Sequence, residues 1–207
     1  MPAGSPEKTA ARREEIMNAC AQLYEAMTFH DITLKEIGEV TSFSRPSIYN
    51  YFKSKEEIFL ALFEQEYDLW TADLKKITEK NERLDHAQLA DQVARSLEKR
   101  KLMLKILSVN LYDLEENSRM ERLVSFKYSY KRSTDAVRNL MRKFCPEMNE
   151  EALERFILVF LPFLHGVHPY AFATRKQMEA MDQAKVPYGG RTIYSLVYGG
   201  LINILNQ

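Results

Sequence analysis

Side chains that can hydrogen-bond to a nucleic acid are concentrated in one short stretch, residues 42–55. Arg45, Ser47, Tyr49 and Asn50 follow one another closely there, and the stretch holds three basic residues and no acidic one. Such side chains bind base edges in the major groove and backbone phosphates. The whole chain is balanced, with 29 basic and 29 acidic residues among 207. This local charge predicts a small docking surface, not a protein that coats nucleic acid through bulk charge.

Two short helices joined by a tight turn are expected to position these side chains, over residues 33–52. Thr33 followed by Glu36 has the spacing of a capping box at a helix start. Ser44 is a good N-cap for the second helix. Pro46 then falls in the first turn of that helix, where its missing N–H costs little.

Apolar residues give each of the two helices one side that can be buried. Leu34, Ile37 and Val40 recur at helical spacing in the first helix. In the second, Ile48 and Phe52 lie four residues apart and are expected to anchor the helix to the core. The polar side chains named above are left to face outward.

The stretch resembles the DNA-binding signature of the TetR/AcrR family of transcriptional regulators. The matching positions are Ser44, Tyr49, Phe52, Lys53, Ser54, Lys55 and Glu57. The resemblance covers roughly residues 10–70. It implies a homodimeric regulator, most often a repressor, that a small molecule releases from double-stranded operator DNA. The DNA-binding residues that it indicates are Thr33, Ser44, Arg45, Pro46, Ser47, Tyr49, Asn50, Tyr51 and Lys55.

Three positions depart from the family pattern. Thr28, Ser42 and Pro46 stand where the family usually has glycine. Glycine adopts positive φ easily and other residues do so poorly. The turn geometry at Thr28 and Ser42 is therefore expected to differ from the family's.

The periodicity of the whole chain predicts an all-α fold with no strand. Helices are expected over residues 7–27, 55–80, 86–99, 120–144, 149–173 and 191–205. Residues 101–111 are strongly apolar and expected to be buried, and residues 113–119 and 174–190 are expected to be polar and non-helical. We expect an N-terminal three-helix helix-turn-helix head within residues 10–70. A helical body for effector binding and dimerisation follows in residues 71–207.

The body is rich in aromatic side chains and methionine, which favours a mostly apolar ligand. The candidate pocket residues are Trp70, Met103, Phe126, Tyr130, Phe160, Phe163, His165 and Tyr170. The competing interpretation is that they fill a solid core and that the regulator has no small-molecule input. Its body would then only dimerise or bind a protein. The expected dimer interface lies on the last helix, at Ile193, Val197, Gly200, Leu201 and Ile204.

Other classes of function lack support in the sequence. There is no glycine-rich phosphate loop and no hydrolase motif, so neither an enzyme nor a cofactor is expected. His165 and His168 lie one helical turn apart, but no further ligand completes a metal site. Cys20 and Cys145 form no disulfide or zinc spacing. With no signal peptide and no apolar run of about 18 residues, we expect a cytoplasmic protein without a membrane partner.

Overall fold

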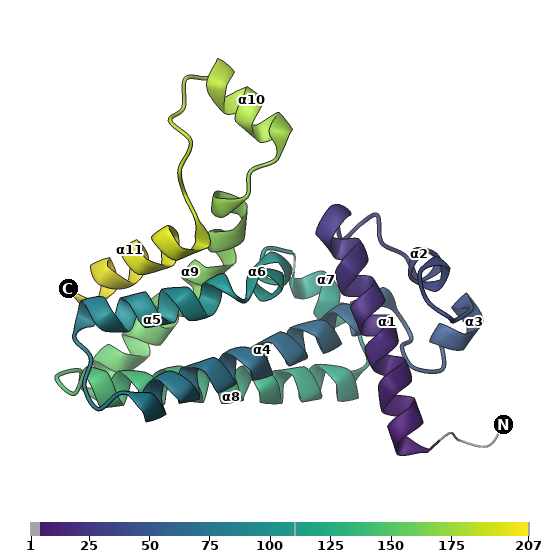
Figure 1. Ribbon diagram of the computed structural model, residues 1–207, viewed down its shortest axis with the longest axis horizontal. Helices are drawn as coiled ribbons and strands as arrows, with labels where there is room; N and C mark the ends of the chain where they lie inside the picture. Colours follow the sequence, from purple (N-terminus) through teal and green to yellow (C-terminus); the bar gives the residue numbers. More distant parts are fainter. Residues whose placement is uncertain (1–4, 110, 207) are drawn as a thin grey trace. The chain divides into compact units, whose positions relative to one another are not determined.

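The computed structural model describes residues 5–109 and 111–206, and within them it contains helices and no strand, as predicted. The helices are α1 (Pro6–Ala26), α2 (Leu34–Glu39), α3 (Arg45–Ile48), α4 (Lys55–Lys80), α5 (His86–Glu98), α6 (Lys101–Leu107), α7 (Leu111–Glu116), α8 (Met120–Phe144), α9 (Glu150–Ala171), α10 (Arg175–Gln183) and α11 (Ile193–Leu205) (Figure 1). Contacts divide the chain into two compact units. Unit 1 takes in Met1–Gln65 and Val109–Tyr130, and unit 2 takes in Glu66–Ser108 and Lys131–Gln207. Helices α4 and α8 therefore supply residues to both units.

Unit 1 is held together by a small apolar core under α1, α2 and α3. Ile16 on α1, Ile37 on α2 and Ile48 on α3 are fully buried, and Phe52 after α3 joins them. The predicted anchoring of the second short helix by Ile48 and Phe52 is confirmed. Val40 is wrong as a core residue: it caps the C-terminus of α2 and is 52% exposed.

Unit 2 is built around the C-terminal part of α4 and the packing of α11 on α5 and α9. Trp70 and Leu74 on α4 are completely buried. The Trp70 indole N–H donates to Ser96 Oγ on α5 at 3.1 Å, so its polar edge is satisfied inside the core. In Figure 1, α5 and α11 lie side by side, whereas α10 projects away from them on two connecting segments.

Gly200 allows α11 to approach α9 closely. A Cβ at this position would lie 2.7 Å from Cζ of Phe163, far inside van der Waals contact. At the preceding Gly199, an added Cβ would meet nothing within 4 Å. The expectation that this glycine pair admits another helix is therefore confirmed at Gly200, where the neighbour is α9 of the same chain.

Two segments that were expected to be non-helical contain short helices. Helix α7 occupies much of the predicted break at 113–119, because Leu114 buries its side chain completely and gives the six-residue helix a core contact. Helix α10 lies within the polar segment 174–190 and buries no residue. Thr174 and Gln177 form a capping box at its start, which satisfies N–H groups that have no partner within the helix.

In the described residues, no single helix is both long and apolar enough to cross a membrane. Helices α9 and α10 pass that test only as a pair, by length and composition, and they are bent by 83° at the break between them.

Candidate DNA-binding surface

The turn between α2 and α3 is fixed from α1. Glu15 accepts hydrogen bonds from Ser42 through both the backbone N–H, at 2.9 Å, and the hydroxyl, at 2.7 Å. The backbone N–H contributes most to lowering the pKa of Glu15, followed by the hydroxyl. Thr28 and Ser42 do not take up positive φ, which among described non-glycine residues occurs at Lys185. The two departures from the family pattern are thus accommodated without left-handed backbone.

Gly38 lets α2 lie close to this turn. A Cβ there would be 3.3 Å from the carbonyl oxygen of Phe43 and 3.6 Å from the backbone nitrogen of Arg45. A larger residue would push α3 away from α2. The absence of a side chain at Gly38 therefore helps to set the position at which α3 begins.

The caps of α2 and α3 differ in detail from those predicted. Ser44 is the N-cap of α3, as expected, but its hydroxyl makes no capping hydrogen bond and lies 2.9 Å from Ser47 Oγ. Pro46 falls in the first turn, as predicted. At α2, Thr33 Oγ1 accepts from the backbone N–H of Lys35 at 3.2 Å and hydrogen-bonds to Glu36.

The polar side chains that the sequence singled out lie at the N-cap of α2, on α3 and in the residues next to α3. Exposed residues of the predicted set are Thr33, Ser44, Arg45, Pro46, Tyr49 and Asn50, whereas Ser47, Tyr51 and Lys55 are half-buried. Arg45 Nη2 donates to Tyr49 Oη at 3.3 Å, and its guanidinium lies 5.9 Å from the centre of the Tyr49 ring. All of these residues belong to unit 1. Arg45 and Tyr49 therefore form a linked pair of hydrogen-bonding side chains on the surface.

Helix α1 contributes two arginines to the same end of unit 1. Arg12 Nη1 donates to Tyr51 Oη at 3.1 Å. The guanidinium of Arg13 stacks over the buried Phe52 ring at 4.7 Å, and burial lowers its pKa. Arg12 remains exposed and holds the phenol of Tyr51 in place.

The lysines after α3 are tied to backbone carbonyl groups. Lys53 Nζ donates to the carbonyl of Tyr49 at 2.8 Å. Lys55 Nζ donates to the carbonyl of Phe29 at 2.7 Å and lies 4.3 Å above the Phe29 ring. Lys55 thus ties the start of α4 to the loop after α1.

A buried carboxylate joins the end of the helix-turn-helix to the start of α8. Glu57 is 1% exposed and accepts from the backbone N–H of Lys53 at 2.9 Å. It also accepts from Arg119 through Nε at 2.6 Å, Nη2 at 2.9 Å and the backbone N–H at 3.2 Å. Burial alone would raise the pKa of Glu57, but these hydrogen bonds outweigh it and lower the pKa to about 2.

Half of the predicted capping box at α4 is present. Ser54 Oγ accepts from the backbone N–H of Glu57 at 3.2 Å. The Ser54 hydroxyl also donates to the carbonyl of Asn117 at 2.9 Å, while the Glu57 carboxylate is engaged by Arg119 and Lys53. Both side chains thus link α4 to the segment before α8.

The predicted ligand-pocket residues fall into both units. Phe126 and Tyr130 belong to unit 1, where Phe126 packs against Phe63 with ring centres 5.0 Å apart. In unit 2, Trp70, Met103 and Phe160 are buried in the core, Phe163 and His165 are half-buried, and Tyr170 is 58% exposed. A hollow of about 320 Å³ between α4 and α5 has a different lining, which includes Asp73, Lys76, Gln92, Arg95 and Lys99. The apolar pocket stays a prediction.

Most of the residues predicted for the dimer interface are occupied within a single chain. Ile193, Val197 and Leu201 are 4%, 0% and 2% exposed, because this side of α11 packs on α5 and α9. Gly200 faces Phe163, and Ile204 is half-buried. Ile193, Val197 and Leu201 therefore hold α11 in unit 2, which argues against the predicted interface at these three positions; at Gly200 and Ile204 it stays a prediction.

The chain matches two family descriptions that together span most of its length. Residues 16–62 match bacterial regulatory proteins of the tetR family, and residues 64–201 match the tetracyclin repressor-like C-terminal domain. The chain belongs to the TetR family.

Known members that resemble this TetR-family chain extend the comparison. The transcriptional regulator RutR of Escherichia coli K12 is 31% identical over 70 residues, 34% of this chain and 33% of RutR. The chain thus matches about a third of the length of this relative. The fatty acid degradation regulator FadR of Bacillus halodurans has the same fold, with a TM-score of 0.62 at 13% identity over 98% of this chain and 96% of that one. FadR of Bacillus subtilis in complex with stearoyl-CoA gives 0.61 at 12% identity, over 93% and 97%.

The sequence did not reveal the long-range partners of two residues on α1 in this TetR-family head. Arg12 and Glu15 lie 39 and 27 residues from their partners Tyr51 and Ser42. The recurring apolar positions on α1 indicate which side faces the core. These apolar positions do not show which polar side chains of α1 contact the turn between α2 and α3.

Proposed function

We propose that this chain is a sequence-specific DNA-binding transcriptional regulator, a cytoplasmic repressor that acts as a homodimer. The observation that carries the proposal is the exposed polar set on α3 and next to it, supported by the fixed turn before α3. Residues 10–70 would form the DNA-binding head, and residues 71–207 the body that binds an effector and dimerises. Family membership supports both parts.

Within the head, we assign two kinds of contact. Arg45, Ser47, Tyr49 and Asn50 read base edges from α3, since such side chains match donor and acceptor patterns in the major groove. The outlying residues Thr33, Tyr51 and Lys55 bind backbone phosphates. Lys55 would exchange its present bond to a backbone carbonyl for a phosphate oxygen.

The test is operator affinity after removal of one base-reading side chain. An operator is first selected from random duplex DNA with the wild-type protein, and gel-shift titrations follow at fixed salt concentration. Arg45→Ala should cost about 1–3 kcal/mol on the selected operator and relax specificity at one position. Asn50→Ala should behave similarly.

Arg175→Ala is a matched control, because Arg175 is also an exposed arginine at the start of a short helix but lies in unit 2. It should bind the operator as the wild type does. Wild-type affinity in both Arg45→Ala and Asn50→Ala would remove the assignment of α3 as the reading element.

We further propose that a small, mostly apolar molecule bound to the body lowers operator affinity. The support is the density of aromatic and methionine side chains in that part of the chain. Helix α4, which begins at the head and carries Trp70, is the element through which such a ligand would act. A ligand can shift operator affinity only through its preference for one of two conformations. Coupling of about 1–3 kcal/mol would change the affinity about 5–150-fold.

The competing function, a regulator without small-molecule input, is favoured by one observation: Trp70, Met103 and Phe160 are buried in the core. Trp70 emission during titration with apolar compounds separates the two functions. Stearoyl-CoA belongs in the panel because a regulator of the same fold is known in complex with it. Free coenzyme A is its matched control. A compound that changes Trp70 emission and also releases operator DNA supports the effector. If no compound in the panel does both, the result supports the regulator without small-molecule input.

A further inference from the structure

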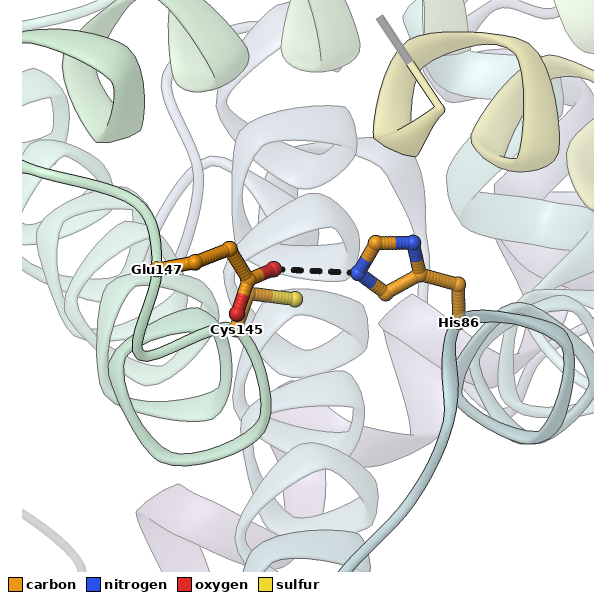
Figure 2. A group of neighbouring side chains, drawn as sticks. All are labelled: His86, Cys145 and Glu147. Atoms are coloured by element: carbon orange, nitrogen blue, oxygen red, sulfur yellow. Dashed lines mark hydrogen bonds and ion pairs between the residues drawn. The ribbon is translucent and has the colours of Figure 1, made fainter.

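Three side chains with metal-binding atoms converge at one end of unit 2. His86 is the first residue of α5, Cys145 directly follows α8, and Glu147 lies in the turn before α9. Their ligand atoms all lie within 4.8 Å of one another. Figure 2 shows the thiol and the carboxylate directed toward the imidazole from the opposite side. None of the three belongs to the proposed DNA-binding surface.

The backbone around the cluster is fixed, so its side chains are presented from ordered positions. Asp85 caps α5 by accepting from the backbone N–H of Gln88 at 2.7 Å, which sets His86 in the first turn. The Cys145 N–H donates to the carbonyl of Met141 at 2.8 Å and extends the bonding pattern of α8. The Cys145 carbonyl accepts from the N–H of Met148 at 3.0 Å and closes the turn that carries Glu147.

The two nitrogens of His86 have different partners. Nε2 lies 3.0 Å from Glu147 Oε1, and Nδ1 lies 3.3 Å from Oδ1 of Asn206, just after α11. Histidines that bind a metal usually donate their other ring N–H to a carbonyl or carboxylate oxygen, which fixes the tautomer. Asn206 is placed to do this, and Nε2 is then directed at the thiol and the carboxylate.

The donor set is one imidazole nitrogen, one sulfur and one carboxylate oxygen. Zn²⁺ takes these three donors at about 2.0–2.3 Å in tetrahedral sites, where ligand atoms stand roughly 3–4 Å apart. The present separations need only small side-chain rotations to reach this arrangement. The cluster also borders an open hollow of about 610 Å³, lined in part by Asp85, Phe144 and Asn206, which leaves room for a fourth ligand such as water.

We propose that His86, Cys145 and Glu147 bind a zinc-type divalent cation. Binding releases the thiol proton to solvent, together with the Nε2 proton of His86 where the imidazole is doubly protonated. Burial raises the pKa of the Cys145 thiol to about 11, and the cation supplies the positive charge that holds it as thiolate. The bound cation connects the start of α5 to the turn between α8 and α9. It thereby gives the protein a second input that does not depend on the apolar effector.

The test uses the full-length, reduced, metal-stripped protein and Co²⁺ as a spectroscopic substitute for Zn²⁺. The expected result is saturation at a single equivalent, with a thiolate-to-cobalt charge-transfer band. Cys145→Ser should abolish the band, and His86→Gln should weaken binding by at least about tenfold, since each removes one of only three protein ligands. Asn206→Ala, which removes only the group that orients His86, should lower affinity about 10–100-fold while keeping the band.

Cys20→Ala is the matched control, because Cys20 is the other buried cysteine and belongs to unit 1. It should keep the band. The proposal fails if the wild type gives no band, or if the band survives in Cys145→Ser. If Cys145→Ser does not fold, the His86→Gln variant provides the test. The rise in melting temperature on adding Zn²⁺ is then compared between this variant and the wild type. An equal rise in both overturns the site.

Discussion

Glu57 has two structural roles, one at the start of α4 and one in an ion pair with Arg119, and the sequence predicts only the first. Its position three residues after Ser54 correctly predicts the start of α4. Its carboxylate, however, is held by Arg119, which lies 62 residues away. Local spacing cannot predict such a partner, because it depends on how α8 returns to α4. With 1% of Glu57 exposed, the ion pair is shielded from solvent on the carboxylate side.

Replacing Glu57 by Gln should destabilise the protein by about 3 kcal/mol at pH 7. A carboxylate whose pKa falls from about 4.5 to about 2 on folding contributes roughly this amount when ionised. The contribution is present above pH 4.5 and is lost as the pH falls toward 2. Urea unfolding from pH 7 to pH 3 should therefore show the gap between wild type and Glu57→Gln narrowing.

Glu56→Gln, at the neighbouring position, is the control and should change stability by less than about 0.5 kcal/mol. If the gap between wild type and Glu57→Gln stays constant over this pH range, the loss comes from packing, and the charged interaction is not its source.

At the scale of elements, prediction succeeded where a helix has a long apolar stripe. Phe59, Phe63, Tyr67, Trp70 and Leu74 repeat at helical spacing, and α4 runs over the predicted residues 55–80 with all five buried. Helices α7 and α10 lack such a stripe. Among the side chains of α7 that the structure describes, Leu114 is the buried one, and α10 has its capping box, so neither helix gives a periodic signal.

The contact between α11 and α9 can be tested through its adjacent glycines. In Gly200→Ala the new methyl group would lie 2.7 Å from Phe163 Cζ, so the ring or the helix must shift. Overpacking of this kind costs about 1–3 kcal/mol. Gly199→Ala has open space and should be neutral or stabilising by up to about 1 kcal/mol, because alanine favours a helix. Thermal and urea unfolding compare the two.

Equal destabilisation by both alanine variants would contradict the close approach of α11 to α9 at Gly200. It would indicate instead that the helix tolerates no side chain on either side. A Phe163→Leu exchange in the Gly200→Ala background should restore part of the lost stability, since it removes ring atoms nearest to the new methyl group.

The molecule as a whole needs a second copy for its proposed function. One short α3 reads too few base pairs for useful specificity, and paired half-sites stand about 34–36 Å apart on one face of DNA. The sequence placed the interface on α11, but Ile193, Val197 and Leu201 of the stripe that it selected are buried within the chain. Hydrophobic periodicity shows that a helix side is buried and cannot show whether the neighbour belongs to the same chain.

The apolar side chains that remain available in this region lie on α9. Leu158 and Val159 are 72% and 53% exposed, and Pro162 is exposed one turn further on. We propose that these side chains form the surface on which a two-fold mate packs. Single exposed apolar residues are ordinary, but neighbouring ones on one helix favour an interface.

Leu158→Arg should therefore produce a folded monomer that binds operator DNA weakly. An arginine at the centre of a packed, symmetric seam would meet its own copy and leave two charges without partners. Sedimentation equilibrium measures the assembly, circular dichroism measures the fold, and gel shift measures the operator affinity.

Leu69→Arg, at a leucine that is 43% exposed on α4, is the matched control and should remain dimeric. Leu201→Arg cannot serve this purpose, because a charge at a site with 2% exposure should unfold unit 2. A dimeric Leu158→Arg protein would place the interface elsewhere.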